Sequence, residues 1–217
     1  MKKKIMFVLI AAISTIALTT GIIASASPQI SIDNLFREMD AELNKQKIIS
    51  DSAEIANVQG VKITALDFRQ YKANVNFVEK SNGQLTNKTE LDLLNEMIKR
   101  ELTVQYALDN GISVSEDEIS IYIDEIRKAL KDAPNEAKEV QRNLIKKSGL
   151  SEEEYWRSED TRNLYRRWIL INKLIEQKYI SGEFKTPEDF NAFQETLLTK
   201  FRNKIQINQD NLIKSVQ

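Results

Sequence analysis

The sequence predicts a mainly α-helical protein that carries a small sheet of two or three strands. Apolar side chains recur three and four positions apart along most of the chain, the spacing of one face of a helix. Short strand-like segments occur in only two places, 54–63 and 204–208, so each is the natural partner of the other. With 41% hydrophobic residues, 29% charged residues and 3 prolines, the composition is that of a folded, helix-rich chain. The sheet is therefore expected to join the N-terminal and C-terminal segments of the domain.

Residues 1–26 have the pattern of an export signal. Three lysines at positions 2–4 precede a charge-free apolar run over 5–24, and Ala24-Ser25-Ala26 supplies the small residues of a cleavage site. The apolar run is also long enough to cross a bilayer, so a retained N-terminal membrane anchor is the alternative. Either reading predicts an extracytoplasmic protein, secreted or anchored at the outer face of the cytoplasmic membrane.

The chain after this segment is expected to consist of an arm and one domain. Residues 27–53 are predicted to form a helical arm or spacer, because their apolar stripe is thin. The domain is predicted over 54–217 and begins with two strands, 54–58 and 61–63, around a tight turn at Gln59-Gly60. The arm's stripe consists of Leu35, Met39 and Leu43.

Capping patterns mark the helix starts of the domain. A hydroxyl side chain followed three residues later by an acid satisfies free amides at a helix start, and acids there suit the helix dipole. Together with the apolar stripes, these patterns predict the order of helices. They are expected after Thr64, over 89–110, from Ser115 to Leu130, before Gly149, from Ser151 towards Tyr179, and after Thr186, where a last helix and strand (187–208) return to the domain.

The residue types argue against an enzyme and against a cofactor. The chain has no histidine and no cysteine, which removes most nucleophile–base pairs, zinc sites and disulfides. Its 6 glycines form no phosphate-binding loop. The two dense acid runs, 116–118 and 152–154, stand at predicted helix starts, where capping and the helix dipole explain them.

Charge argues against nucleic acid as a partner. Beyond residue 26 the chain keeps 28 of its 31 basic and all 32 acidic side chains, a net charge of −4, whereas nucleic-acid binders show a basic excess. One basic flank on the long helix, Arg162, Arg166 and Arg167, is a candidate patch for an anionic polymer or an acidic client. The alternative is a solvated face whose arginines pair with nearby acids.

The order of elements resembles the extracytoplasmic foldases of the SurA and PrsA type. Three stretches that cover roughly residues 54–179 carry the resemblance: AEIANVQGVKITALDF, ELDLLNEMIKRELTVQYALDNGISVSEDEISIYIDEI and GLSEEEYWRSEDTRNLYRRWILINKLIEQKY. The stretch FNAFQETLLTKFRNKIQIN resembles the helix and strand that return to complete the chaperone domain in that family. A parvulin isomerase module usually precedes this return, but here only the link 180–185 does. The resemblance thus implies a SurA/trigger-factor-like chaperone domain without the isomerase module.

This resemblance implies a non-enzymatic holdase for unfolded or partly folded exported polypeptides. Such domains hold extended clients through adaptable apolar surfaces. Four aromatic residues beside the main stripes are candidate client contacts, with packing at the edge of the core as the alternative for each. They are Tyr71, Phe77, Tyr122 and Tyr155. The alternative function is an adaptor that holds one folded partner or an anionic cell-wall polymer on the same scaffold.

Overall fold

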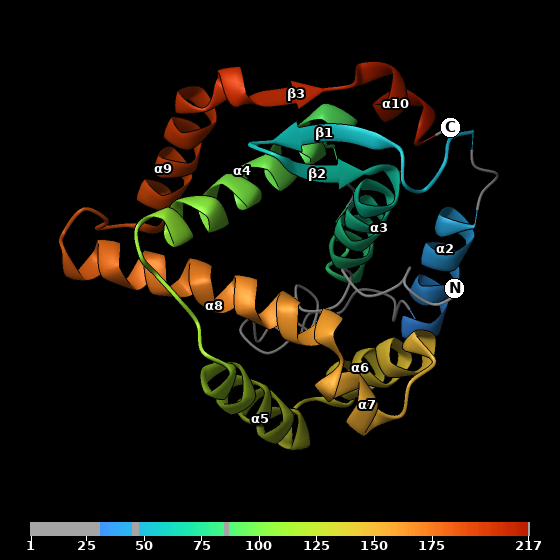
Figure 1. The fold of residues 1–217 in the computed structure, drawn as a ribbon. Coiled ribbons are helices and arrows are strands. Elements are labelled where there is room, and N and C mark those ends of the chain that lie inside the picture. Colours follow the sequence, from blue (N-terminus) through green and yellow to red (C-terminus); the bar gives the residue numbers. More distant parts are fainter. Residues whose placement is uncertain (1–30, 45–47, 85–86, 217) are drawn as a thin grey trace. The chain divides into compact units, whose positions relative to one another are not determined.

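The computed structural model describes residues 31–44, 48–84 and 87–216 and is mainly helical with one small sheet, as the sequence predicts (Figure 1). The predicted signal or anchor, residues 1–26, lies outside the described residues. Along the chain the helices are α2 (Ile32–Leu43), α3 (Ala65–Ser81), α4 (Glu90–Asp109), α5 (Glu116–Asp132), α6 (Asn135–Ser148), α7 (Glu152–Arg157), α8 (Glu159–Ile180), α9 (Pro187–Lys200) and α10 (Gln209–Lys214), and the strands are β1 (Glu54–Val58), β2 (Val61–Thr64) and β3 (Ile205–Ile207).

The chain forms two compact units that alternate along the sequence. Unit 1 takes its residues from Met1–Lys47, Arg69–Asn87 and Ser120–Tyr165. Unit 2 takes its residues from Ile48–Phe68, Lys88–Ile119 and Arg166–Gln217. The chain passes from one unit to the other within α3, α5 and α8, so each of these helices contributes residues to both units.

The sheet belongs to unit 2 and has the strand order β2-β1-β3, with both pairs antiparallel. Val58 lies opposite Val61 in β2 and opposite Ile205 in β3, so the predicted pairing of the two ends of the domain is confirmed. The β1–β2 turn places Gln59 at φ 53° and Gly60 at φ 94°. Two residues of positive φ fit a tight hairpin whose twist matches that of the strands.

The core of unit 2 packs α4 against β1, α8 and α9. Val104 and Ala107 of α4 are buried against Leu170 and Leu174 of α8. A polar contact ties the helix to the sheet, since Gln105 Nε2 donates to the Val58 carbonyl at 3.1 Å. The sheet is thus held on α4 by both apolar packing and a hydrogen bond.

Unit 1 contains the predicted arm as a packed helix. α2 buries Leu35, Phe36 and Met39 and lies against α6. The rings of Phe36 and Phe77 have centroids 4.8 Å apart. Lys80 of α3 and Glu38 of α2 form an ion pair at 2.6 Å.

The long helix predicted from Ser151 is divided in two. Ser158 has ψ 143°, an extended conformation that ends α7. Its side-chain Oγ accepts a hydrogen bond from the Thr161 amide at 3.3 Å, so Ser158 caps the start of α8. The short helix α10 was not predicted, and Asn208 caps it by accepting from the Asn211 amide at 3.0 Å.

None of the helices in 31–44, 48–84 and 87–216 is both long and apolar enough to span a bilayer. The stretch proposed as a tether, residues 5–24, falls outside these ranges.

Candidate client-binding surface

Two of the four predicted aromatic contacts lie in the core of unit 1. Phe77 is 3% exposed and Tyr155 is fully buried. The Tyr155 ring meets the Trp156 ring edge to face with centroids 5.2 Å apart, and burial raises the pKa of its hydroxyl above the usual value. As they are placed, these two rings offer a client no surface, which favours the packing alternative.

The other two predicted contacts are half-buried. The Tyr122 ring lies 5.5 Å from the Tyr165 ring, at a tilt of 55°. Tyr71, on α3, is also partly exposed. A role for Tyr71 and Tyr122 in client contact therefore stays a prediction.

The predicted basic patch consists of arginines that have partners within their own units. In unit 2, Arg166 pairs with Glu116, and Arg167 pairs with Glu101 at 2.5 Å. In unit 1, Arg162 donates to the Ser120 hydroxyl at 3.2 Å. Much of this positive charge is thus compensated within each unit.

The Arg167–Glu101 pair belongs to a polar network that supports the sheet. The Glu101 side chain is 10% exposed, whereas that of Arg167 is 40% exposed. Glu101 also accepts from Gln105 Nε2 at 3.0 Å, and the same nitrogen donates to the Val58 carbonyl. This arrangement satisfies a carboxylate that would be costly to bury alone.

A second charged contact fixes the start of α5. The Glu118 carboxylate accepts from the Ser115 amide at 2.8 Å and pairs with Lys173. The hydrogen bond from Lys173 and the bond from the Ser115 amide lower the pKa of Glu118 to about 2. The predicted capping box is therefore present, and a cation of α8 strengthens it.

The most exposed large apolar side chain in the described part of the chain stands at the end of α8. Ile180 is 79% exposed and its neighbour Tyr179 is 39% exposed. We call these two residues, together with the cluster of aromatic rings that Tyr179 joins, the α8-end surface. The other rings of the cluster are Phe184, Phe190, Phe193 and Tyr106.

The aromatic rings of the α8-end surface form a connected cluster within unit 2. Phe184 is 5% exposed and lies 5.9 Å from Tyr179 and 5.6 Å from Phe193, in edge-on geometry. The Phe193 ring meets the Tyr106 ring at 5.1 Å, and the Lys178 ammonium lies over both. Edge-to-face rings and a cation over their faces stabilise such a cluster.

The turn after α8 is held in place by polar contacts. Lys178 pairs with Glu183 at 2.5 Å, and this contact raises the pKa of Lys178 and lowers that of Glu183. Gly182 has φ +76°, a left-handed conformation that glycine adopts without strain. Sequence reasoning treated this segment only as a link and missed the α8-end surface. The signal was the apolar pair Tyr179-Ile180 immediately before the turn.

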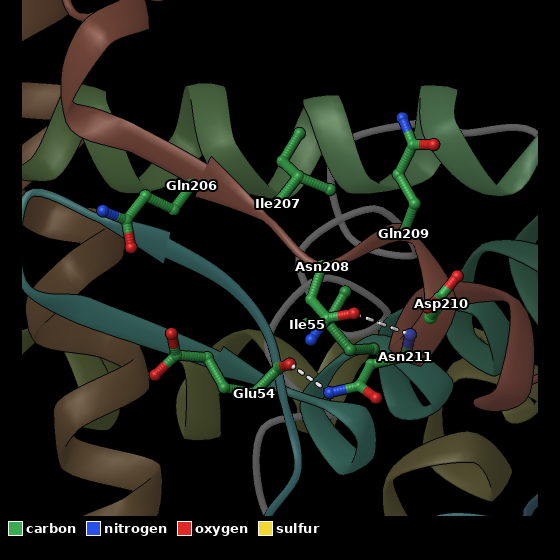
Figure 2. A pocket seen from close by; sticks show the side chains of 8 residues that line it. All are labelled: Glu54, Ile55, Gln206, Ile207, Asn208, Gln209, Asp210 and Asn211. Carbon is green, nitrogen blue, oxygen red and sulfur yellow. Dashed lines mark hydrogen bonds between the residues drawn. The ribbon is translucent and has the colours of Figure 1, made fainter.

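A polar hollow of about 570 Å³ lies beside β3 in unit 2 (Figure 2). Two of its lining residues are joined by a hydrogen bond, because Asn211 Nδ2 donates to the Glu54 carbonyl at 2.9 Å. Its lining consists of Glu54, Ile55, Gln206, Ile207, Asn208, Gln209, Asp210 and Asn211. The described ranges contain no cluster of side chains suited to hold a metal ion.

A family model described as a SurA-like N-terminal domain matches residues 2–175. No curated protein and no solved structure matches the chain.

Proposed function

Because the chain belongs to the SurA-like N-terminal domain family, we propose that it is a non-enzymatic holdase for unfolded or partly folded exported polypeptides. The family indicates a chaperone-type module that binds polypeptide clients in general. The proposal adds to this the holding activity, the class of client and the surface.

The α8-end surface is the observation that carries the proposal. Ile180 is 79% exposed and its neighbour Tyr179 is 39% exposed, so the end of α8 presents two adjacent apolar side chains that a client could cover. Covering the side chain of Ile180 with a client would contribute about 1.5–3 kcal/mol. A holdase needs contacts of this modest size, because it must release its clients.

The α8-end surface combines a fixed ring cluster with accessible apolar side chains. Phe184 is buried and fixed by three aromatic neighbours, while Tyr179 and Ile180 remain accessible. The site thus offers apolar area with little dependence on the exact shape of the client. This suits unfolded chains, which share apolar side chains but no common surface.

Suppression of the aggregation of a denatured client is the direct test. The purified protein should keep the client in solution, and Ile180→Ser should weaken this several-fold without changing the unfolding midpoint. Ile121→Ser is the matched control, because Ile121 is an exposed isoleucine (59%) on α5. The proposal fails if the wild-type protein neither suppresses aggregation nor binds unfolded peptides, or if the two variants lose activity equally.

The adaptor alternative depends on the basic side chains Arg162, Arg166 and Arg167. The ion pairs of Arg166 and Arg167 with Glu116 and Glu101 weaken this reading, because an anionic polymer would have to displace them. Crosslinking in intact cells separates the two functions. A holdase captures many clients, whereas an adaptor captures one.

The proposal includes an extracytoplasmic location and no isomerase activity. Members of the family are typically extracytoplasmic, and residues 1–26 would act as a cleaved signal or as a retained anchor. N-terminal sequencing of the exported protein distinguishes these two outcomes. In a proline-isomerisation assay the protein should leave the uncatalysed rate unchanged.

A further inference from the structure

Among the residues that the structure describes, strand β3 has a neighbouring strand on one side only. It pairs with β1, and the strand order β2-β1-β3 places it at an edge of the sheet (Figure 1). All three residues of β3 are at least partly exposed. An edge strand of this kind presents unpaired backbone groups that can pair with another extended chain.

The ladder between β1 and β3 shows which backbone groups point outward. Gln59 N donates to the Lys204 carbonyl at 3.1 Å, and Asn208 N donates to the Ile55 carbonyl at 2.7 Å. Hydrogen-bonding direction alternates along an antiparallel strand, so Lys204, Gln206 and Asn208 face β1. The backbone groups of Ile205 and Ile207 therefore face away from it.

Three of these outward groups are available for a new strand. The Ile205 amide is used locally, since it donates to the Arg202 carbonyl. No hydrogen bond within the described ranges uses the Ile205 carbonyl or the amide and carbonyl of Ile207. The backbone of an added strand could form two hydrogen bonds with Ile207, one to its carbonyl and one from its amide. It could also donate one hydrogen bond to the Ile205 carbonyl.

The side chains of β3 also leave apolar surface uncovered. Ile207 lies opposite Ala56, which is buried, yet Ile207 itself is 36% exposed. Figure 2 shows Gln206 and Ile207 pointing to opposite sides of the strand. A fourth strand beside β3 would cover part of the exposed surface of Ile207.

Positive charge gathers just before β3. The side chains of Lys200, Arg202 and Lys204 are exposed, and none of them has an ion-pair partner among the residues that the structure describes. Lys200 and Lys204 instead lie over the Phe201 ring, at 5.3 and 5.7 Å. These three cations complement an acidic side chain on a segment that runs along β3.

The opposite edge of the sheet is less suited to pairing. In β2, Lys62 is exposed and pairs with Glu54 at 3.2 Å, and a charged residue on an edge strand discourages strand addition. The Thr64 amide is already bonded to the Asp67 carboxylate at 2.9 Å. The two edges therefore differ in charge and in free backbone groups.

We propose that β3 accepts an extended, acidic segment of a client polypeptide as a fourth strand. This inference rests on the proposed holdase function and adds a second, backbone-directed contact to the α8-end surface. Main-chain hydrogen bonds supply affinity for any extended sequence. An acidic residue beside Arg202 and Lys204 supplies selectivity.

Binding of a short labelled peptide tests the proposal. The probe is a six-residue Val/Thr peptide that ends in two aspartates, and its counterpart ends in two lysines. The fluorescence anisotropy of each labelled peptide is measured as the full-length protein is added. The aspartate peptide should bind at least tenfold more tightly than the lysine peptide. Bound peptide should also slow hydrogen exchange at the Ile207 amide.

Two variants probe the backbone and the charge separately. Ile207→Pro removes one outward amide but no amide of the β1–β3 ladder, so it should cut affinity about tenfold while circular dichroism stays unchanged. Arg202→Glu with Lys204→Glu should reverse the preference between the two peptides. This second variant keeps the proposal testable if the proline variant does not fold.

The outcomes separate this inference from the proposed function. If the protein suppresses aggregation but the aspartate peptide does not bind, or binds without protecting Ile207, the inference is wrong and the holdase function stands. If neither activity is found, the holdase function fails as well. A concentration-dependent dimer that Ile207→Pro abolishes would assign this edge to a second copy of the chain and overturn the inference.

Discussion

Replacement of Arg167 by alanine should destabilise unit 2 far more than the same change at Arg166. Arg167→Ala leaves the Glu101 carboxylate, which is 10% exposed, without its cation. Arg166→Ala removes a pair whose acid, Glu116, is 64% exposed. The two arginines are adjacent on α8, so they form a matched comparison.

The exposure of each partner sets the expected size of the effect. Breaking a fully buried ion pair costs about 3–5 kcal/mol, but Arg167 is itself 40% exposed, so we expect about 2 kcal/mol. The surface pair of Arg166 should contribute less than about 1 kcal/mol. For a urea m-value of about 2 kcal/mol per M, Arg167→Ala lowers the unfolding midpoint by about 1 M.

Urea unfolding followed by circular dichroism measures both values. The double variant Arg167→Ala/Glu101→Gln should regain part of the loss, because a neutral amide needs no cation. Equal midpoints for Arg166→Ala and Arg167→Ala would refute the reasoning. So would a double variant no more stable than Arg167→Ala.

Three further predictions concern the helix starts and the core. Thr89→Ala should lower the free energy of unfolding by about 1 kcal/mol, because the Thr89 hydroxyl accepts from the Asp92 amide at 3.2 Å; an unchanged urea midpoint would contradict this. Phe68→Ala should cost about 3–5 kcal/mol, since the ring is fully buried, and a loss below 1 kcal/mol would show that the site collapses. Glu118 has a folded pKa of about 2 against an ordinary 4.5, so its ion pair stabilises the fold fully above pH 4.5 and loses this effect as the pH falls to about 2. Glu118→Gln should therefore flatten the pH dependence of the unfolding midpoint over that window, and an unchanged slope would count against the assignment.

The strands and caps could be predicted because local chemistry determines them. In the sequence, 204–208 is the only good candidate partner for the strands of 54–63, so the two segments were expected to pair. The hydroxyl–acid pattern at Ser115 specifies its own hydrogen bonds, and the structure shows both of them. Neither result depends on how distant helices pack.

The candidate site could not be predicted because exposure is a property of packing. Phe77 lies on one flank of a helix, and only its contact with Phe36 of α2 shows that this flank is buried. Ile180 reads as the end of an apolar stripe, yet the turn at Gly182 leaves it in solvent. The helix α10 carries only two apolar residues, Leu212 and Ile213, too few to show a stripe.

The pairing of β1 with β3 has a consequence for the protein while it is being synthesised. Val58 and Ile205 lie 147 positions apart in the chain, and contacts this distant form late in folding. At a synthesis rate of about 5–20 residues per second, β3 appears roughly 7–30 s after β1. During that interval the β1–β2 hairpin has an unpaired strand edge and resembles the extended chains that the finished protein is proposed to hold. While it is being synthesised, the protein is thus itself a potential client.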